Sequence, residues 1–132
     1  MNITSREVDR ITILDLDGRL TAGPNSGALR ERIVQLSNES QLNVILNLKN
    51  CEFIDSTGLG TMVVCYTALQ KQGGALKLEN LSRRHVELLV LTKLTTIFEI
   101  FDNERDAINS FYPDREVKRF DILDFVKEQS QN

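Results

Sequence analysis

Three adjacent residues, Asp55, Ser56 and Thr57, have side chains that could take part in chemistry, and Gly58 follows them directly. Apolar residues precede this group over 43–48 and recur after it at spacings of three and four, which predicts a buried strand before it and an amphipathic helix after it. All three polar types favour the N-cap of a helix, where free backbone N–H groups and the helix dipole attract an anion. We therefore expect the two hydroxyls at a helix N-terminus.

Catalysis by these hydroxyls is not expected, because a serine or threonine nucleophile needs a neighbouring base. His85 is the only histidine of the chain, and it falls on a predicted polar helix face far along the sequence. The sequence also lacks metal-ligand spacing, a P-loop and a dinucleotide fingerprint, so no cofactor and no catalytic residue is assigned. An enzyme or a small-ligand protein is the least favoured class. Phosphorylation of Ser56, with Thr57 as the second choice, fits the pattern better, and helix capping alone stays open as the alternative.

The composition limits the classes of protein. A chain of 132 residues with 41% hydrophobic residues can fill a single core. The net charge of −3 argues against nucleic acid as a partner, since such binding needs clustered positive charge. The N-terminus has no apolar signal region and no apolar run approaches the roughly 20 residues of a membrane span, so we expect a cytoplasmic protein without membrane insertion. Cys65 is expected to be a small buried residue and Cys51 a structural thiol, with a reactive thiol at Cys51 as the alternative.

Strand and helix signals alternate along most of the chain. Gly18 is expected to end the second strand, and Thr21 or Gly23 to cap a helix that Pro24 begins. In chain order, the predicted elements are a hairpin of strands 3–8 and 11–16, a helix from 24 to about 39, a strand at 43–48, a helix ending near Gln72, a strand at 75–78, a helix capped by Ser82, a strand at 96–101 and a short helix at 104–110. This order predicts an α/β fold, a mixed β-sheet of four to five strands with helices mainly on one face.

Residues 111–132 form a C-terminal extension beyond this pattern. Val117, Phe120, Leu123 and Val126 recur every third residue, which predicts a weakly amphipathic helix. A tail that packs on its own domain or frays is the favoured interpretation. A helix that binds a partner or forms a homodimer is the alternative.

The run Asp55-Ser56-Thr57-Gly58-Leu59-Gly60, between a buried strand and a helix, resembles the phosphorylation motif of bacterial anti-sigma-factor antagonists, a family of STAS domains. Gln72-Gly73-Gly74, the strand at 75–78 and the helix start at Leu81-Ser82 follow in the order of that family. The resemblance covers roughly residues 2–110, so 1–110 is the expected STAS domain. It implies the STAS fold and a protein that acts by binding.

The same resemblance implies a phosphorylation switch. The unphosphorylated protein would bind an anti-sigma factor that is also a serine kinase, and would so free a sigma factor. The kinase would then phosphorylate Ser56 with its own ATP, and a phosphatase would reverse the reaction. The partner-binding residues that it implies are Asp55, Ser56, Thr57, Gly58, Leu59, Thr21 and Asn25. A non-catalytic STAS scaffold, or a subunit of a stress-sensing or lipid-transport assembly, is the alternative function.

One departure from the family pattern concerns the chain after Gly18. The family commonly has Gly-x-Leu-Asp at this point, whereas this sequence has Gly18-Arg19-Leu20-Thr21. Thr21 cannot offer a carboxylate to a basic partner surface. We therefore expect a divergent partner or a different regulatory role.

Overall fold

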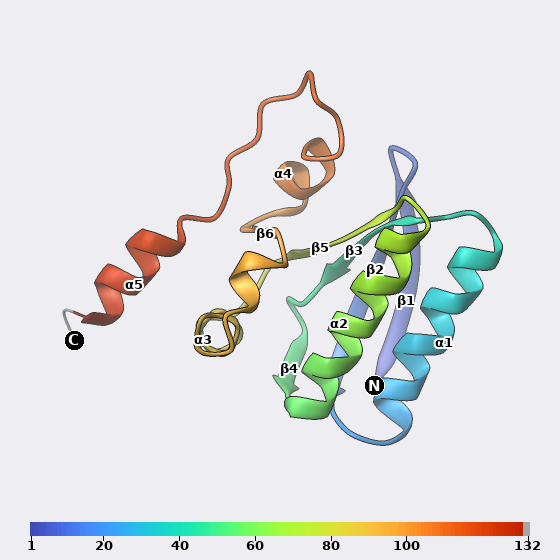
Figure 1. Cartoon of the computed structure of the whole chain (residues 1–132), viewed down its shortest axis with the longest axis horizontal. Coiled ribbons are helices and arrows are strands. Elements are labelled where there is room, and N and C mark those ends of the chain that lie inside the picture. The colour runs from blue at the N-terminus through green and yellow to red at the C-terminus, as the bar shows by residue number, and fades with distance from the viewer. Residues whose placement is uncertain (131–132) are drawn as a thin grey trace.

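A mixed sheet of six strands forms the centre of the computed structural model, which describes residues 1–130 (Figure 1). The strands are β1 (Asn2–Val8), β2 (Ile11–Leu20), β3 (Asn43–Asn47), β4 (Cys51–Ile54), β5 (Ala75–Glu79) and β6 (Ile100–Phe101). Their order is β1-β2-β3-β5-β6, with β4 paired to the second half of β2. The β1–β2 pair is antiparallel, and the other pairs are parallel. The predicted mixed sheet is confirmed, but it has six strands and not four to five, because the sequence pattern did not reveal β4.

β2 is longer than predicted because Gly18 does not end it. Gly18 has a φ of 121°, a value that glycine adopts without strain, and the pairing register shifts between Gly18 and Arg19. Before this bulge β2 pairs with β3, and after it β2 pairs with β4 as far as Leu20 opposite Ile54. The bulge therefore carries β2 on to the strand that immediately precedes Asp55.

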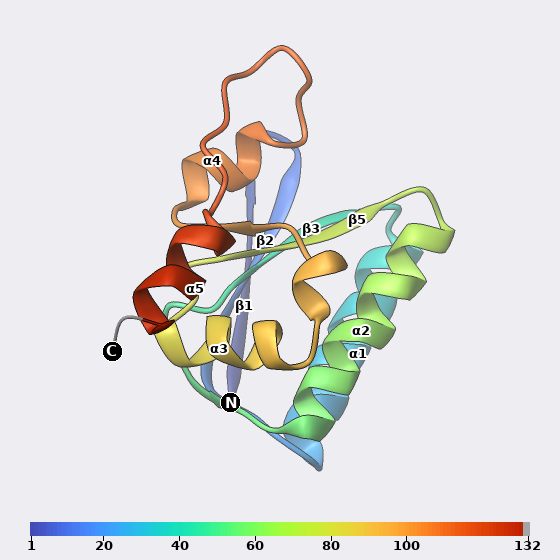
Figure 2. The ribbon, with the colours of Figure 1, turned by 60° about the vertical axis from the view of Figure 1, so that its left-hand side comes forward.

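Alternation along the strands divides the apolar residues between two faces of the sheet. The helices are α1 (Pro24–Asn38), α2 (Ser56–Lys71), α3 (Arg83–Leu91), α4 (Glu104–Asn109) and α5 (Ile122–Ser130). Leu14 and Leu16 of β2 belong to the larger hydrophobic cluster, which they share with α1, α2 and α3. Ile11 and Ile13 point the other way, where α4 covers them with Ile108. Helices thus lie mainly on one face, as predicted, with α4 on the other (Figure 2).

The predicted strand at 96–101 is mostly wrong. Leu94–Thr96 form a 3-10 helix, η1, and only the last two residues of the predicted strand form β6, paired with the end of β5. Phe98 is buried, and its ring meets the Tyr66 ring of α2 edge to face with 5.4 Å between their centroids. The alternating apolar residues therefore belong to a turn that packs on α2, with a short strand after it.

The C-terminal extension contains a helix, α5, but this helix begins at Ile122 and leaves out Val117 and Phe120 of the predicted apolar stripe. Leu123 is 73% exposed. Phe120 and Ile122 pack instead against the larger cluster, the Phe120 N–H donates to the Ile100 carbonyl at 3.4 Å, and the Phe125 ring lies 6.0 Å from the Phe120 ring. The tail thus packs on its own domain while Leu123 stays in solvent.

A cluster of charged side chains joins α4 to the sheet. The Arg6 guanidinium of β1 lies 2.6 Å from the Asp15 carboxylate and 2.6 Å from the Glu104 carboxylate of α4. Glu79 of β5 is fully buried, and the Asn80 amide donates to its Oε2 at 3.1 Å. Burial, together with a hydrogen bond to Glu104, raises the pKa of Glu79 to about 9. A protonated carboxyl group is therefore part of this joint at neutral pH.

Candidate functional site

Asp55 is the N-cap residue of α2, as its residue type predicts. Its Oδ1 accepts a hydrogen bond from the Gly58 N–H at 2.7 Å, and its Oδ2 accepts one from the Ala22 N–H at 3.0 Å. The first bond caps the helix, and the second ties the loop between β2 and α1 to the start of α2. These N–H donors, Gly58 first, hold the pKa of Asp55 below its ordinary value. Asp55 is therefore an ionised structural group with both oxygens engaged.

Gly58 allows α2 to begin against the end of β2. A Cβ at this position would lie 2.1 Å from the Leu20 carbonyl oxygen, closer than real Cβ atoms approach. The same carbonyl accepts the Asp55 N–H at 3.2 Å, which restrains it from moving away. Leu59 is also buried. Gly58 and Leu59, both expected among the partner-binding residues, thus lie inside the domain and position the residues around them.

Ser56 and Thr57 are the first two residues of α2, and both are exposed. Within residues 1–130, no hydrogen bond engages the Ser56 hydroxyl. The N–H groups of the first helical turn and the helix dipole give this end of α2 a partial positive charge. The geometry therefore presents Ser56 as an accessible hydroxyl at a helix N-terminus, where the sequence predicted it.

The loop between β2 and α1 holds Thr21 and Asn25, the other two expected site residues. Thr21 is half-buried, and its carbonyl accepts the Ser26 hydroxyl at 2.7 Å. The Asn25 amide donates to the Arg19 carbonyl at 2.8 Å. The N-cap of α1 is Gly23 and not Thr21. Gly23 has a φ of 94°, which glycine adopts without strain, and no side chain caps α1. Through Asp55, this loop is fixed to the start of α2.

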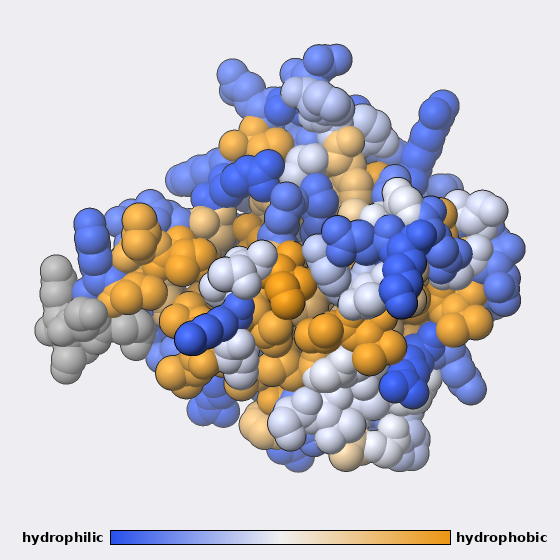
Figure 3. All heavy atoms as spheres, viewed as in Figure 1, coloured by the Kyte–Doolittle hydropathy of each residue, from blue (hydrophilic) through white to orange (hydrophobic). Residues whose placement is uncertain are grey.

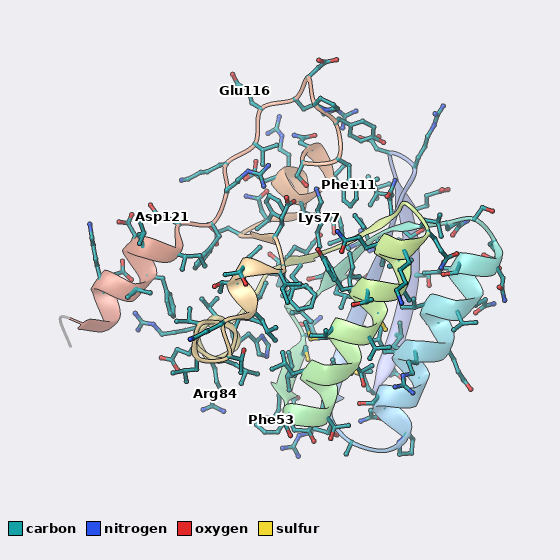
Figure 4. The ribbon with its side chains drawn as sticks, viewed as in Figure 1. Phe53, Lys77, Arg84, Phe111, Glu116 and Asp121 are labelled. Atoms are coloured by element: carbon teal, nitrogen blue, oxygen red, sulfur yellow. The ribbon has the colours of Figure 1, made fainter. Side chains whose placement is uncertain are left out.

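A groove near this site, which we call the β4–α3 groove, was not expected from the sequence. It lies between β4 and α3, has a volume of about 220 Å³, and is lined by Phe53, Ile54, Arg84, His85, Glu87, Leu88 and Leu91. Phe53 is 37% exposed, and the Arg19 guanidinium lies 5.3 Å from its ring centroid. Figure 4 shows Phe53 and Arg84 close together at the end of the molecule where α2 begins. Because β4 was not predicted, no signal in the sequence placed Phe53 on the surface.

A family model described as the STAS domain matches residues 2–107. This chain belongs to the STAS domain family. Over 72 residues it is 44% identical to the anti-sigma-B factor antagonist of Bacillus subtilis (strain 168). These 72 residues make up 54% of this chain and 65% of that protein. The match therefore spans less than two thirds of the length of that relative.

Solved structures share the fold of this STAS domain. A Thermotoga maritima protein described as a candidate anti-sigma factor antagonist has a TM-score of 0.77 and 25% identity, over 82% of this chain and 92% of that chain. The Bacillus cell fate determinant SpoIIAA in its phosphorylated form has a TM-score of 0.66 and 20% identity, over 83% of this chain and 99% of that chain. These similarities confirm the predicted STAS fold.

His85 has a structural role in this STAS domain. Its Nδ1 accepts the Ser82 N–H at 3.3 Å, and the Ser82 hydroxyl accepts the His85 N–H at 3.1 Å, which forms a capping box at the start of α3. Burial, with a smaller effect of Arg84, lowers the pKa of His85. The predicted polar face is correct for Arg83 and Arg84, which are exposed, but wrong for His85, because the capping box turns that ring inward.

The cysteines of this STAS domain are buried free thiols, as predicted. Burial raises the pKa of both, that of Cys65 to about 11, and a neutral thiol is a poor nucleophile and metal ligand. In the part of the chain that the structure describes, no three His, Cys, Asp or Glu side chains are placed to hold a metal ion. Among the helices of residues 1–130, none combines the length and the apolar character needed to cross a membrane.

Proposed function

We propose that this STAS domain is an anti-sigma-factor antagonist whose binding is switched by phosphorylation of Ser56. The unphosphorylated form binds an anti-sigma factor and frees a sigma factor. Phosphorylation by the serine kinase activity of that partner ends the binding, and a phosphatase restores it. The observation that carries the proposal is the exposed Ser56 hydroxyl, which directly follows the N-cap Asp55. The names of the similar proteins support the class of partner and the modification.

A phosphate on Ser56 would change the surface more than the fold. It adds about −1.5 to −2 charges and three acceptor oxygens at the first residue of α2. The helix dipole favours an anion there by about 0.3–1 kcal/mol, which offsets part of the repulsion from Asp55. A partner surface that packs against the unmodified hydroxyl would instead be repelled by the phosphate, or binding would have to remove water from it. A loss of about 3 kcal/mol weakens binding more than a hundredfold.

The bond between Asp55 and the Ala22 N–H makes the loop between β2 and α1 part of the same surface. Thr21 and Asn25 stand in that loop, so a partner that covers Ser56 also meets the loop. Thr21 supplies no carboxylate, and Arg19 adds an exposed positive charge nearby. The matching surface of the partner is therefore less basic than one that binds the family's usual acid.

A second candidate is a non-catalytic STAS scaffold, or a subunit of a stress-sensing or lipid-transport assembly, in which the motif is a constitutive interface. Thr21 in place of the family's acid favours it, since the usual charged contact with a kinase partner is lost. Isolation of the native complex distinguishes the two. A serine kinase in the complex supports the switch, whereas a large homo-assembly or a transporter ATPase supports the scaffold.

The direct test compares Ser56→Asp and Ser56→Ala for binding to the anti-sigma factor isolated from the native cells. Ser56→Asp should weaken binding by about tenfold or more while the free energy of unfolding changes by less than about 1 kcal/mol, because the side chain is exposed. Ser56→Ala should bind and should not be phosphorylated. Isothermal titration calorimetry and intact-mass spectrometry measure these outcomes.

Ser40→Asp is the matched control, because Ser40 is also exposed but lies in the turn after α1. It should leave the affinity unchanged. An affinity that Ser56→Asp leaves at the wild-type value would contradict the switch. Phosphorylation of Ser56→Ala with unchanged stoichiometry would instead move the acceptor to Thr57 or to another residue.

A further inference from the structure

Arg19 of β2 is an exposed arginine beside the start of α2. It pairs in register with Phe53 of β4, and its guanidinium lies 5.3 Å from the centroid of the Phe53 ring. Figure 4 shows Phe53 at the end of the molecule where α2 begins. Within residues 1–130, no ion pair or hydrogen bond engages the Arg19 guanidinium. Stacking on a partly exposed ring is a weak contact, so the guanidinium can leave it for a stronger partner.

Contacts between β2 and α2 bring Ser56 close to Arg19. The carbonyl of Leu20, which directly follows Arg19, accepts the Asp55 N–H at 3.2 Å. Gly58 packs against the same carbonyl, and Ser56 lies between Asp55 and Gly58 in the chain. Side chains of an α-helix lean toward its N-terminus, so the Ser56 side chain leans toward the strand ends. Arg19 and Ser56 therefore border the same corner, where β2, β4 and the start of α2 meet.

The groups around this corner can accommodate an added anion. The free N–H groups of the first turn of α2 and the helix dipole are positive there. Both oxygens of the nearby Asp55 carboxylate are engaged, by the N–H groups of Gly58 and Ala22. Thr21, two residues after Arg19, has no carboxylate that would compete for the guanidinium. Figure 3 shows the surface over the start of α2 mainly in the pale colours of weakly polar residues, so a phosphate there stays in polar surroundings.

We propose that Arg19 binds the phosphate of phosphorylated Ser56 within the same molecule. The inference rests on the proposed function, because it takes Ser56 as the residue that carries the phosphate. The guanidinium leaves the Phe53 ring and donates two N–H groups to two phosphate oxygens, and this bidentate pair is stronger than the stacking contact. Arg19 is thus a positioning residue for the phosphate.

This contact changes more of the surface than the phosphate alone. In the unphosphorylated form, Arg19 offers a positive charge next to an exposed hydroxyl, and a partner can contact both. In the phosphorylated form the guanidinium is occupied, and the Phe53 ring loses the group that stacks on it. A partner that binds through Arg19 therefore loses this contact in addition to meeting the phosphate.

Phosphorus NMR of the full chain tests the contact, with phosphoserine incorporated at position 56 during protein synthesis so that no kinase is needed. The second pKa of a phosphoserine is ordinarily about 6. Arg19 should lower this pKa, so Arg19→Gln should raise it by about 0.5 or more relative to the phosphorylated wild type. Arg19→Lys keeps the charge without the planar pair of donors, and it should restore only part of the difference.

Arg84→Gln is the matched control, because Arg84 is also exposed and lines the β4–α3 groove together with Phe53. It should leave the pKa of the phosphate unchanged. Without the phosphate, both glutamine variants should unfold at the wild-type temperature, since both side chains are exposed. With the phosphate, Arg19→Gln should unfold at a lower temperature than the wild type, whereas Arg84→Gln should not.

Equal pKa values of the phosphate in the wild type and in Arg19→Gln would overturn the proposal. A rise with Arg84→Gln and none with Arg19→Gln would overturn it as well, because it would assign the phosphate to α3. Whether Ser56 is phosphorylated in the cell is measured separately, by the mass of the native protein. Failure of the proposed function and failure of the Arg19 contact are therefore distinguishable.

Discussion

Replacing Gly58 by alanine tests whether the close contact between α2 and β2 positions the site. The added Cβ would lie 2.1 Å from the Leu20 carbonyl oxygen and 2.8 Å from its carbonyl carbon, and these backbone atoms cannot turn aside as the end of a side chain can. Overpacking of this kind costs about 1–3 kcal/mol. In a domain of this size, the midpoint of thermal unfolding should fall by roughly 4–12 °C.

Gly60→Ala is the control, because it makes the same chemical change two residues further along α2. Nothing lies within 4 Å of a Cβ at Gly60, which is exposed. Alanine there should stabilise the helix by about 0.5–1 kcal/mol, since glycine loses more backbone entropy on folding. The two substitutions should therefore change stability in opposite directions.

Thermal and urea unfolding followed by circular dichroism measure both variants. Gly58→Ala should also weaken binding to the anti-sigma factor, because a shifted helix start disturbs the bonds from Gly58 and Ala22 to Asp55. Gly60→Ala should not. If Gly58→Ala proved as stable as Gly60→Ala, the contact with Leu20 would not be the reason for glycine, and this account of how the site is positioned would be wrong.

The remaining predictions concern two carboxyl groups. The pKa of Glu79 is raised from 4.5 to about 9 in the fold, so the folded state keeps a proton that the unfolded chain loses, and the free energy of unfolding should fall as the pH rises through this range. Glu79→Gln offers an N–H in place of the O–H and should make the free energy of unfolding, measured with urea, less dependent on pH. Equal slopes of this free energy against pH for the variant and the wild type would show that Glu79 is ionised in the fold. The N–H donors lower the pKa of Asp55 in the folded state. Its contribution to the free energy of unfolding is therefore present above the ordinary pKa of aspartate, and it is lost as the pH falls through the lowered pKa of the folded state. Asp55→Ala should therefore lower the midpoint of thermal unfolding at neutral pH. Asp55→Asn should lower it less, because asparagine still caps the helix. Equal midpoints for the two variants would count against the capping role of Asp55.

The start of α2 could be predicted because its determinants are local in the chain. Asp55 is a preferred N-cap type, and the spacing of Leu59, Met62 and Leu69 places one face of the helix in the core, where all three are buried. The exposed position of Ser56 follows from the same pattern. The capping of α3 by Ser82 was predicted for the same reason.

Several features could not be predicted because they depend on partners far along the chain. Gly18 permits a bulge instead of ending β2, because β2 pairs with β3 before the bulge and with β4 after it. The short segment Cys51–Ile54 becomes a strand only because β2 continues beside it. His85 lies in a charged sequence but is buried where α3 meets β4, beside Phe53 and Ile54.

The sequence by itself determined the chemistry available at the site: a hydroxyl residue after a capping aspartate, at the positive end of a helix. Tertiary structure decided what surrounds it. The bond from the Ala22 N–H to Asp55 joins residues 33 apart, and the β4–α3 groove forms only where a strand and a helix from different parts of the chain meet. Local propensities specify caps and helix faces, whereas a surface assembled from distant segments exists only after the sheet has set their register.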